Sequence, residues 1–418
     1  MINNRILARL ESWSEGKAMP PERVLIYPTN RCNLKCVFCY QRLNPYNVKE
    51  DLPKKRWLEI TEELCNMGVD ILQISGGGEP LLVKDTTIEM MKIIKRHRKT
   101  GRLVNNGTLW TEKIIEETIK MRWDNVIFSL DGDTPQINDF HRGVKGTFKK
   151  IIFAIKKFDE LKKKYRTDTP QLELSSVLTN KNYKRTTKLI HLASKIGIKV
   201  ITFEPVFISN PFGLKLKLNL KQREEFIKKH IPKSLDLAKK LNIMTNLETL
   251  IDLKTIEKTG NLKKEILRKK ALAEKIFLRI SQKITPHRKR SKKTNYNSAE
   301  PESEKKLEKK SKNHFDNTDF LSYKQKKFVN SICYEPWLWP KIEANGDVGA
   351  CSSNIIPGAN VRNRNFKEIW QGKEFNEFRK KFLNNEIPDG CKNCVSTHLP
   401  LNKRMRIELL KHLAQKNG

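Results

Sequence analysis

The sequence predicts an α/β protein: a partial (β/α)6 barrel of the TIM type, followed by a small cysteine-rich domain. Two observations predict the barrel. Apolar runs of strand length alternate with amphipathic stretches of helical period between residues 22 and 215, and the alternation repeats six times. Strands separated by helices of this length form parallel sheets, whose functional side chains gather at the C-terminal strand ends.

Each predicted strand is a short run rich in branched or aromatic residues. The six runs cover residues 23–29, 70–75, 102–106, 125–130, 171–178 and 198–207. Between them lie amphipathic stretches at 57–67, 87–98, 112–121, 148–164 and 183–197. Their apolar residues recur at the spacing of one helix face, so we expect each helix to cover the sheet.

Changes in composition divide the rest of the chain. We expect an N-terminal helix or extension at 1–21, the barrel at 22–215 and a helical connection at 216–250. A basic, lysine-rich insertion at 251–330, partly disordered in its middle, precedes the cysteine-rich domain at 331–396 and a C-terminal helix at 397–418. The insertion suits either a flexible spacer or an arm for an anionic partner.

The net charge of the 418-residue chain is +36, which favours attraction to polyanions such as nucleic acid. No nucleic-acid-binding motif accompanies the charge, and lysine is abundant throughout, so a solvated basic surface explains it equally well. The sequence contains no apolar run long enough to span a membrane and no signal peptide. We therefore expect a cytoplasmic protein, in which clustered cysteines bind metal rather than form disulfides.

Three cysteines follow the first predicted strand. Cys32, Cys36 and Cys39 are spaced C-x3-C-x2-C. Thiolates are the ligands of iron–sulfur clusters, and three of them on a 4Fe–4S cluster leave one iron open to an amine and a carboxylate. A structural zinc site with a fourth ligand from elsewhere is the alternative.

This motif, with Phe38 before its third cysteine, resembles the radical S-adenosylmethionine (SAM) superfamily. The resemblance implies a SAM-binding 4Fe–4S cluster and reductive cleavage of SAM to a 5′-deoxyadenosyl radical, which abstracts hydrogen from a substrate C–H bond. It also implies that SAM is contacted by the glycine-rich motif after the second strand and by polar residues after the third and fourth. These residues are Gly76, Gly77, Gly78, Glu79, Asn106, Ser129 and Arg142.

Four further cysteines lie near the C-terminus: Cys333, Cys351, Cys391 and Cys394. Asn345-Gly346 marks a hairpin turn before the second of them. The pattern resembles the SPASM and twitch-type auxiliary domains of radical SAM proteins. No cysteine follows Cys394, so the resemblance implies one auxiliary 4Fe–4S cluster without an open iron, suited to electron transfer. A four-cysteine zinc site is the alternative.

Glu204 and Asp131 lie near predicted C-terminal strand ends, where either could act as a general base after hydrogen abstraction. We expect oxidation or crosslinking of a small alcohol, a sugar derivative or a peptide, with a slight preference for the small molecule. A donor such as flavodoxin or ferredoxin would supply electrons. An RNA-modifying radical SAM enzyme and a non-enzymatic iron–sulfur electron carrier are the other possibilities.

Overall fold

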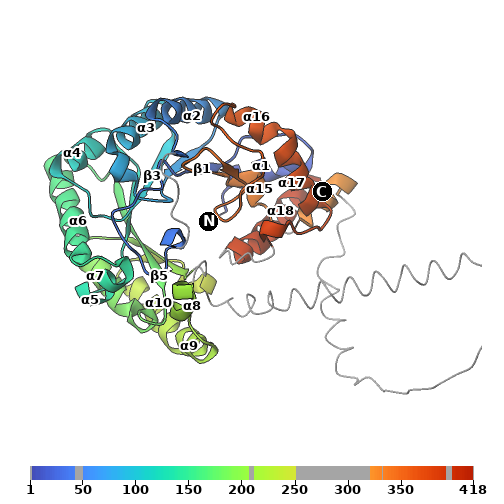
Figure 1. Cartoon of the computed structure of the whole chain (residues 1–418). Coiled ribbons are helices and arrows are strands. Elements are labelled where there is room, and N and C mark those ends of the chain that lie inside the picture. The colour runs from blue at the N-terminus through green and yellow to red at the C-terminus, as the bar shows by residue number, and fades with distance from the viewer. Residues whose placement is uncertain are drawn as a thin grey trace, which may run out of the picture.

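The computed structural model describes residues 2–42, 50–206, 211–250, 321–331, 333–391 and 398–417. Six parallel strands form the wall of a partial barrel, so the predicted fold class is confirmed (Figure 1). Their bounds are β1 Arg23–Ile26, β2 Ile71–Ile74, β3 Thr100–Asn105, β4 Asn125–Ser129, β5 Gln171–Leu178 and β6 Val200–Pro205. Most of the predicted basic insertion, residues 251–320, lies outside the described residues.

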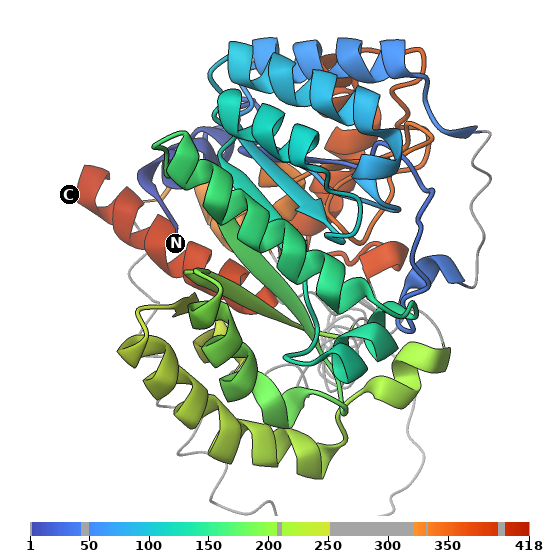
Figure 2. The same cartoon turned by 90° about the vertical axis from the view of Figure 1, so that its left-hand side faces the viewer.

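Helices form an outer arc around these strands (Figures 1 and 2). The helices that follow β1 to β5 are α2 Lys54–Met67, α3 Lys84–Arg96, α4 Glu112–Lys120, α5 Pro135–Arg142, α6 Thr147–Lys164 and α7 Thr186–Lys195. Alternate strand residues such as Ile26, Leu72 and Phe128 are fully buried. Burying each such side chain contributes about 1.5–3 kcal/mol, which holds the helices on the sheet.

The sheet extends beyond the six predicted strands on both sides. Among the described residues it has nine strands, in the order β7-β6-β5-β4-β3-β2-β1-β8-β9. The added strands are β7 Met244–Thr245, β8 Lys341–Ile342 and β9 Val348–Gly349. β8 and β9 form the predicted hairpin, with Gly346 at a φ of +93° in its turn. The sequence did not show that β8 pairs in parallel with β1, which makes the cysteine-rich segment a continuation of the barrel wall.

Segments from both ends of the chain cover the hairpin side of the sheet. They are α1 Asn4–Ser14, α14 Tyr323–Val329, α15 Glu335–Leu338, α16 Phe366–Gln371, α17 Lys373–Leu383 and α18 His398–Asn417. Glu11 of α1 forms ion pairs of 2.8 Å with His412 and Lys416 of α18. The guanidinium of Arg379 is buried over the rings of Trp13 and Trp370, at 4.5 and 4.1 Å. These contacts attach the N-terminal helix to the C-terminal region.

The opposite side of the barrel carries α8 Pro211–Leu216, α9 Leu220–Glu225 and α10 Ile231–Lys240, with a π-helical turn at Phe226–His230. The predicted helical connection therefore also contains the short strand β7. None of the helices in the described part of the chain is long and apolar enough to cross a membrane.

Candidate functional site

The first cysteine loop begins at Cys32, six residues after the end of β1, and is tied to the C-terminus of α5. The backbone N–H groups of Lys35 and Val37 donate to the carbonyl oxygens of Arg142 and His141, at 3.2 and 2.9 Å. Gly143 caps α5 at a φ of +67°, and a Cβ there would lie 2.0 Å from the carbonyl oxygen of Lys35. The two segments approach so closely that only glycine fits.

The thiols of this loop are partly enclosed. Cys32 is exposed when the whole residue is considered, but its sulfur is partly buried. This burial raises the pKa of the Cys32 thiol to about 11. Burial also raises the pKa of Cys36, against the opposing charge of Arg142. Such thiols stay protonated unless a bound cation stabilises the thiolate. A bound metal cluster supplies that cation.

The glycine-rich motif after β2 packs directly on the chain that leads into Cys32. Gly78 and Glu79 donate from their backbone N–H groups to the carbonyl oxygens of Thr29 and Arg31, at 2.9 and 2.8 Å. A Cβ on Gly78 would fall 1.9 Å from the Arg31 oxygen. These glycines therefore allow a close approach of two backbones, in addition to any approach of a ligand that the sequence predicted.

The Glu79 carboxylate points into the protein and is only 2% exposed. Its two oxygens accept hydrogen bonds from the backbone N–H groups of Leu81 and Asn106, at 3.1 and 2.7 Å. Burial raises the pKa of Glu79 to about 7, despite these donors. The carboxylate thus joins the glycine motif to the end of β3, while the backbone N–H of Glu79 binds the chain that leads into Cys32.

Asn106 and Ser129 lie at the C-terminal ends of β3 and β4, as predicted. The Asn106 side chain donates to Asn33 of the cysteine loop at 2.8 Å, and Asn33 donates to Thr108 at 2.8 Å. This amide therefore braces the loop between the first two cysteines. Ser129 is half-buried and lies opposite Ser175 of β5.

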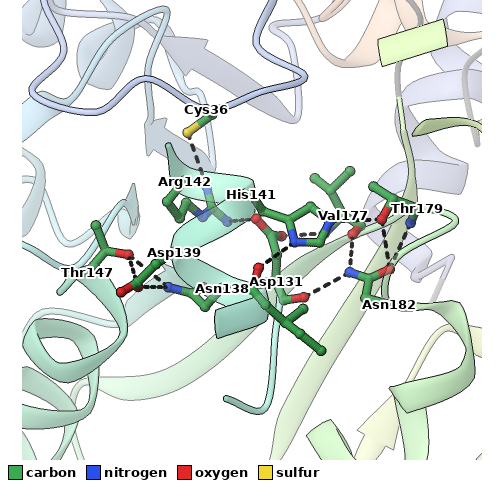
Figure 3. Close-up of polar contacts among 11 residues, drawn as sticks. Cys36, Asp131, Asn138, Asp139, His141, Arg142, Thr147, Val177, Thr179 and Asn182 are labelled. Atoms are coloured by element: carbon green, nitrogen blue, oxygen red, sulfur yellow. Dashed lines mark hydrogen bonds and ion pairs between the residues drawn. The ribbon is translucent and has the colours of Figure 1, made fainter. Parts of the chain in front are cut away.

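Arg142 connects the cysteine loop to the sheet (Figure 3). Its guanidinium forms an ion pair of 2.7 Å with Asp131 and lies 3.9 Å from the sulfur of Cys36 and 6.0 Å from the ring of Phe38. Burial opposes its charge most strongly, but Asp131, Cys36 and Cys32 together outweigh burial, so the pKa of Arg142 is raised. Its buried Nε has no hydrogen-bond partner among the described residues, so a donor remains for an anionic ligand.

The two candidate bases differ in their surroundings. Asp131 is fully buried, and its second oxygen accepts a hydrogen bond from the Val177 N–H at 2.8 Å. With one oxygen on Arg142 and the other on β5, this carboxylate is placed to position Arg142 rather than to meet a substrate. Glu204 is half-buried on β6, opposite Val177.

His141 extends this network toward β5 (Figure 3). Its Nδ1 donates to the Ile137 carbonyl at 2.7 Å, and its Nε2 accepts from the Thr179 hydroxyl at 2.8 Å. Burial lowers the pKa of His141, which favours the neutral ring that this bonding needs. The histidine is a structural element of the site.

The second cysteine set lies on the hairpin side. Cys333, Cys351 and Cys391 are half-buried, whereas Cys394 lies outside the described residues. Each of these three sulfurs faces an N–H donor. The donors are the backbone of Ser353 to Cys351 at 3.4 Å, Asn354 to Cys391 at 3.6 Å and Asn402 to Cys333 at 3.7 Å. Within the described residues, no group of three His, Cys, Asp or Glu side chains is placed to hold a single metal ion.

A buried ion pair links the two cysteine regions. The Lys341 ammonium lies 2.6 Å from Glu343 and donates to the carbonyl of Ser352, next to Cys351, at 3.1 Å. It also lies 5.9 Å from the ring of Tyr27, at the end of β1. Lys341 and Glu343 are only two positions apart, but the approach of Lys341 to Tyr27 depends on the pairing of β8 with β1, which the sequence did not show.

The residues fit iron–sulfur clusters on observations of this chain alone. Partly buried thiols with raised pKa values, N–H donors facing sulfur and an unsatisfied guanidinium nitrogen form surroundings suited to thiolate-bound, anionic groups. A family model for the radical SAM superfamily matches residues 26–172, and a model for the SPASM iron–sulfur cluster-binding domain matches residues 333–395. The chain belongs to the radical SAM superfamily. Membership implies SAM binding and iron–sulfur ligation.

Curated relatives are similar to this radical SAM chain over less than half of its length. The sporulation killing factor maturation protein SkfB of Bacillus subtilis is 29% identical over 36% of this chain and 38% of its own. The AdoMet-dependent heme synthase of Methanosarcina barkeri is 28% identical over 40% of this chain and 46% of its own. PqqA peptide cyclase of Granulibacter bethesdensis is 25% identical over 43% of this chain and 45% of its own. The chain spans less than half the length of these relatives.

Solved structures extend the similarity in fold to most of the chain. SuiB of Streptococcus suis, bound to its precursor peptide SuiA, aligns over 91% of this chain and 73% of its own, with a TM-score of 0.57 and 16% identity. The protein anSMEcpe with bound AdoMet aligns over 95% of both chains, with a TM-score of 0.54 and 16% identity. At this identity the likeness shows a shared fold.

Proposed function

We propose that this radical SAM protein modifies a peptide and that Cys32, Cys36 and Cys39 hold its SAM-binding cluster. The observation that carries the proposal is the position of the three-cysteine loop. It lies at the C-terminal edge of the parallel sheet, braced by α5 and by the glycine motif after β2. Chemistry in barrels of this type takes place at that edge.

The cluster, when bound, supplies an open iron for SAM and the electron whose transfer generates the radical that takes hydrogen from the substrate. The residues of the chain hold and orient the reactants. The braces from Asn106 and Glu79 fix the loop, and Asp131 fixes Arg142 beside Cys36. The unpartnered Nε of Arg142 offers a donor to the carboxylate of SAM, and Ser129 offers a hydroxyl at the neighbouring strand end.

Cys333, Cys351, Cys391 and Cys394 form the proposed auxiliary site. Four thiolates would occupy every iron of one 4Fe–4S cluster, so a cluster held there would pass electrons and would not bind substrate. Cys351 follows the hairpin, which pairs with β1 of the barrel wall, and this pairing supports electron transfer between the two sites. A small electron-carrier protein such as flavodoxin or ferredoxin would supply the reducing electron.

The peptide substrate is supported by the names of the relatives. SkfB is a maturation protein, PqqA cyclase acts on a peptide, and the similar fold of SuiB binds a precursor peptide. These names favour a peptide over the small alcohol or sugar derivative that the sequence slightly preferred. The heme synthase relative is the observation that keeps a non-peptide substrate as a second candidate.

Two variants test the assignment of the sites. Cys36→Ala should abolish formation of 5′-deoxyadenosine, because the SAM cluster loses a ligand. Cys391→Ala should remove the signal of the second cluster while leaving part of the SAM cleavage. Product formation by the Cys36→Ala variant at the wild-type rate would contradict the assignment. Incubation with short peptides encoded beside this chain, followed by mass spectrometry, tests the substrate class.

A further inference from the structure

The second cysteine set receives amide donors from side chains that no motif includes. Asn402 lies on the buried face of α18 and is 3% exposed, and Asn354 follows Cys351 and is 7% exposed. Their Nδ2 atoms lie 3.7 Å from the Cys333 sulfur and 3.6 Å from the Cys391 sulfur. Buried amides need hydrogen-bond partners, and here the partner is sulfur.

The orientation of the Asn402 amide follows from a second contact. Its Oδ1 accepts a hydrogen bond of 2.7 Å from the backbone N–H of Tyr334, the residue after Cys333. A rotated amide would place two N–H donors against each other at Tyr334. The Tyr334 bond therefore fixes Nδ2 toward the sulfur of Cys333.

The helix that carries Asn402 is held firmly against this region. Its buried face also contains Met405, Leu409 and Leu413, and Arg406 donates to the Ser331 carbonyl at 2.7 Å. An asparagine in an otherwise apolar stripe lowers stability unless its amide is satisfied. Asn402 contacts the backbone beside Cys333 through its Oδ1 and the sulfur of Cys333 through its Nδ2, which indicates a role at that site.

We propose that Asn402 and Asn354 are positioning residues that raise the reduction potential of the auxiliary cluster. This inference rests on the proposed function, because it requires a cluster on Cys333, Cys351, Cys391 and Cys394. A reduced cluster carries one more negative charge, spread partly on its sulfur ligands. N–H donors at those sulfurs stabilise the reduced form more than the oxidised form, so the potential rises and the cluster accepts an electron more readily.

The test is a redox titration of the reconstituted full-length protein, followed by electron paramagnetic resonance. The Cys36→Ala background isolates the auxiliary signal. Asn402→Asp keeps the acceptor for Tyr334 and removes the donor to Cys333, but its negative charge also lowers the potential. Asn354→Leu adds no charge and removes only a donor, since the Asn354 Oδ1 has no partner in the described residues, so its shift separates the donor from the charge. Asn384→Leu, at an exposed position after α17, is the matched control.

Each donor variant should shift the reduction equilibrium about tenfold toward the oxidised form, which is a midpoint lower by about 59 mV for one electron. The control should match the parent. Midpoints of Asn354→Leu and Asn402→Asp equal to that of the control would overturn the inference, and Asn354→Leu alone decides if Asn402→Asp assembles no cluster. Absence of any second signal in the parent would instead refute the auxiliary cluster itself.

Discussion

Removing the charge of Asp131 tests whether its ion pair with Arg142 holds the cysteine loop in place. The two side chains are 0% and 8% exposed. Removing one partner of a buried pair leaves the other charge uncompensated and costs about 3–5 kcal/mol. Asp131→Asn keeps an acceptor for the Val177 N–H. The loss of stability should therefore fall on Arg142 and on the end of α5, whose carbonyl groups accept hydrogen bonds from the cysteine loop.

Hydrogen exchange of the apoprotein, resolved by mass spectrometry, measures this loss locally. A cost of about 3 kcal/mol makes opening about a hundredfold more frequent. The peptide that contains the amides of Lys35 and Val37 should therefore exchange at least about a hundredfold faster in Asp131→Asn. Asp133→Asn is the control, because Asp133 pairs with a partly exposed Arg185 at 2.6 Å. Equal exchange of this peptide in both variants would refute the proposed role of Asp131.

Two further predictions concern the glycine motif and its carboxylate. Gly78→Ala should prevent assembly of the SAM cluster, because the new Cβ would fall 1.9 Å from the Arg31 oxygen. Iron content and absorbance after reconstitution measure cluster assembly. A fully assembled SAM cluster in this variant would contradict the prediction. The pKa of Glu79, about 7 in the folded protein, lies above its usual 4.5, so its contribution to stability is complete below about pH 4.5 and is lost as pH rises through 7. The free energy of unfolding of the apoprotein should therefore fall by up to about 3 kcal/mol between pH 4.5 and 7, as measured by denaturant unfolding. Glu79→Gln should remove this pH dependence. An unchanged pH dependence in the variant would show that another group titrates.

The sequence predicted the barrel because its signals are local. Alternating apolar residues mark each strand, and the spacing of Cys32, Cys36 and Cys39 places them in one loop. The hairpin at Gly346 was also predicted, since a turn needs only adjacent residues. What the sequence could not show was that the hairpin pairs with β1, because that contact joins residues more than three hundred positions apart.

The bonds around the site are long-range in the same way. Arg142 and Cys36 are 106 positions apart, and Glu79 and the Asn106 N–H are 27 apart. The resemblance implied that Glu79 contacts SAM, and its place at a strand end made Asp131 a candidate base. In the structure the carboxylate oxygens of both residues contact other residues of the chain, which the sequence did not show. A weak signal existed for Asn402, since a single asparagine interrupts an apolar stripe of helical spacing.

Iron content and SAM cleavage, measured on one anaerobically reconstituted and reduced sample, test the central claim most directly. Two four-iron clusters predict about eight irons per chain together with 5′-deoxyadenosine. About four irons with SAM cleavage would contradict the auxiliary cluster. Bound iron with no 5′-deoxyadenosine, even after candidate peptides are added, would contradict radical SAM chemistry at Cys32, Cys36 and Cys39 and favour an electron carrier.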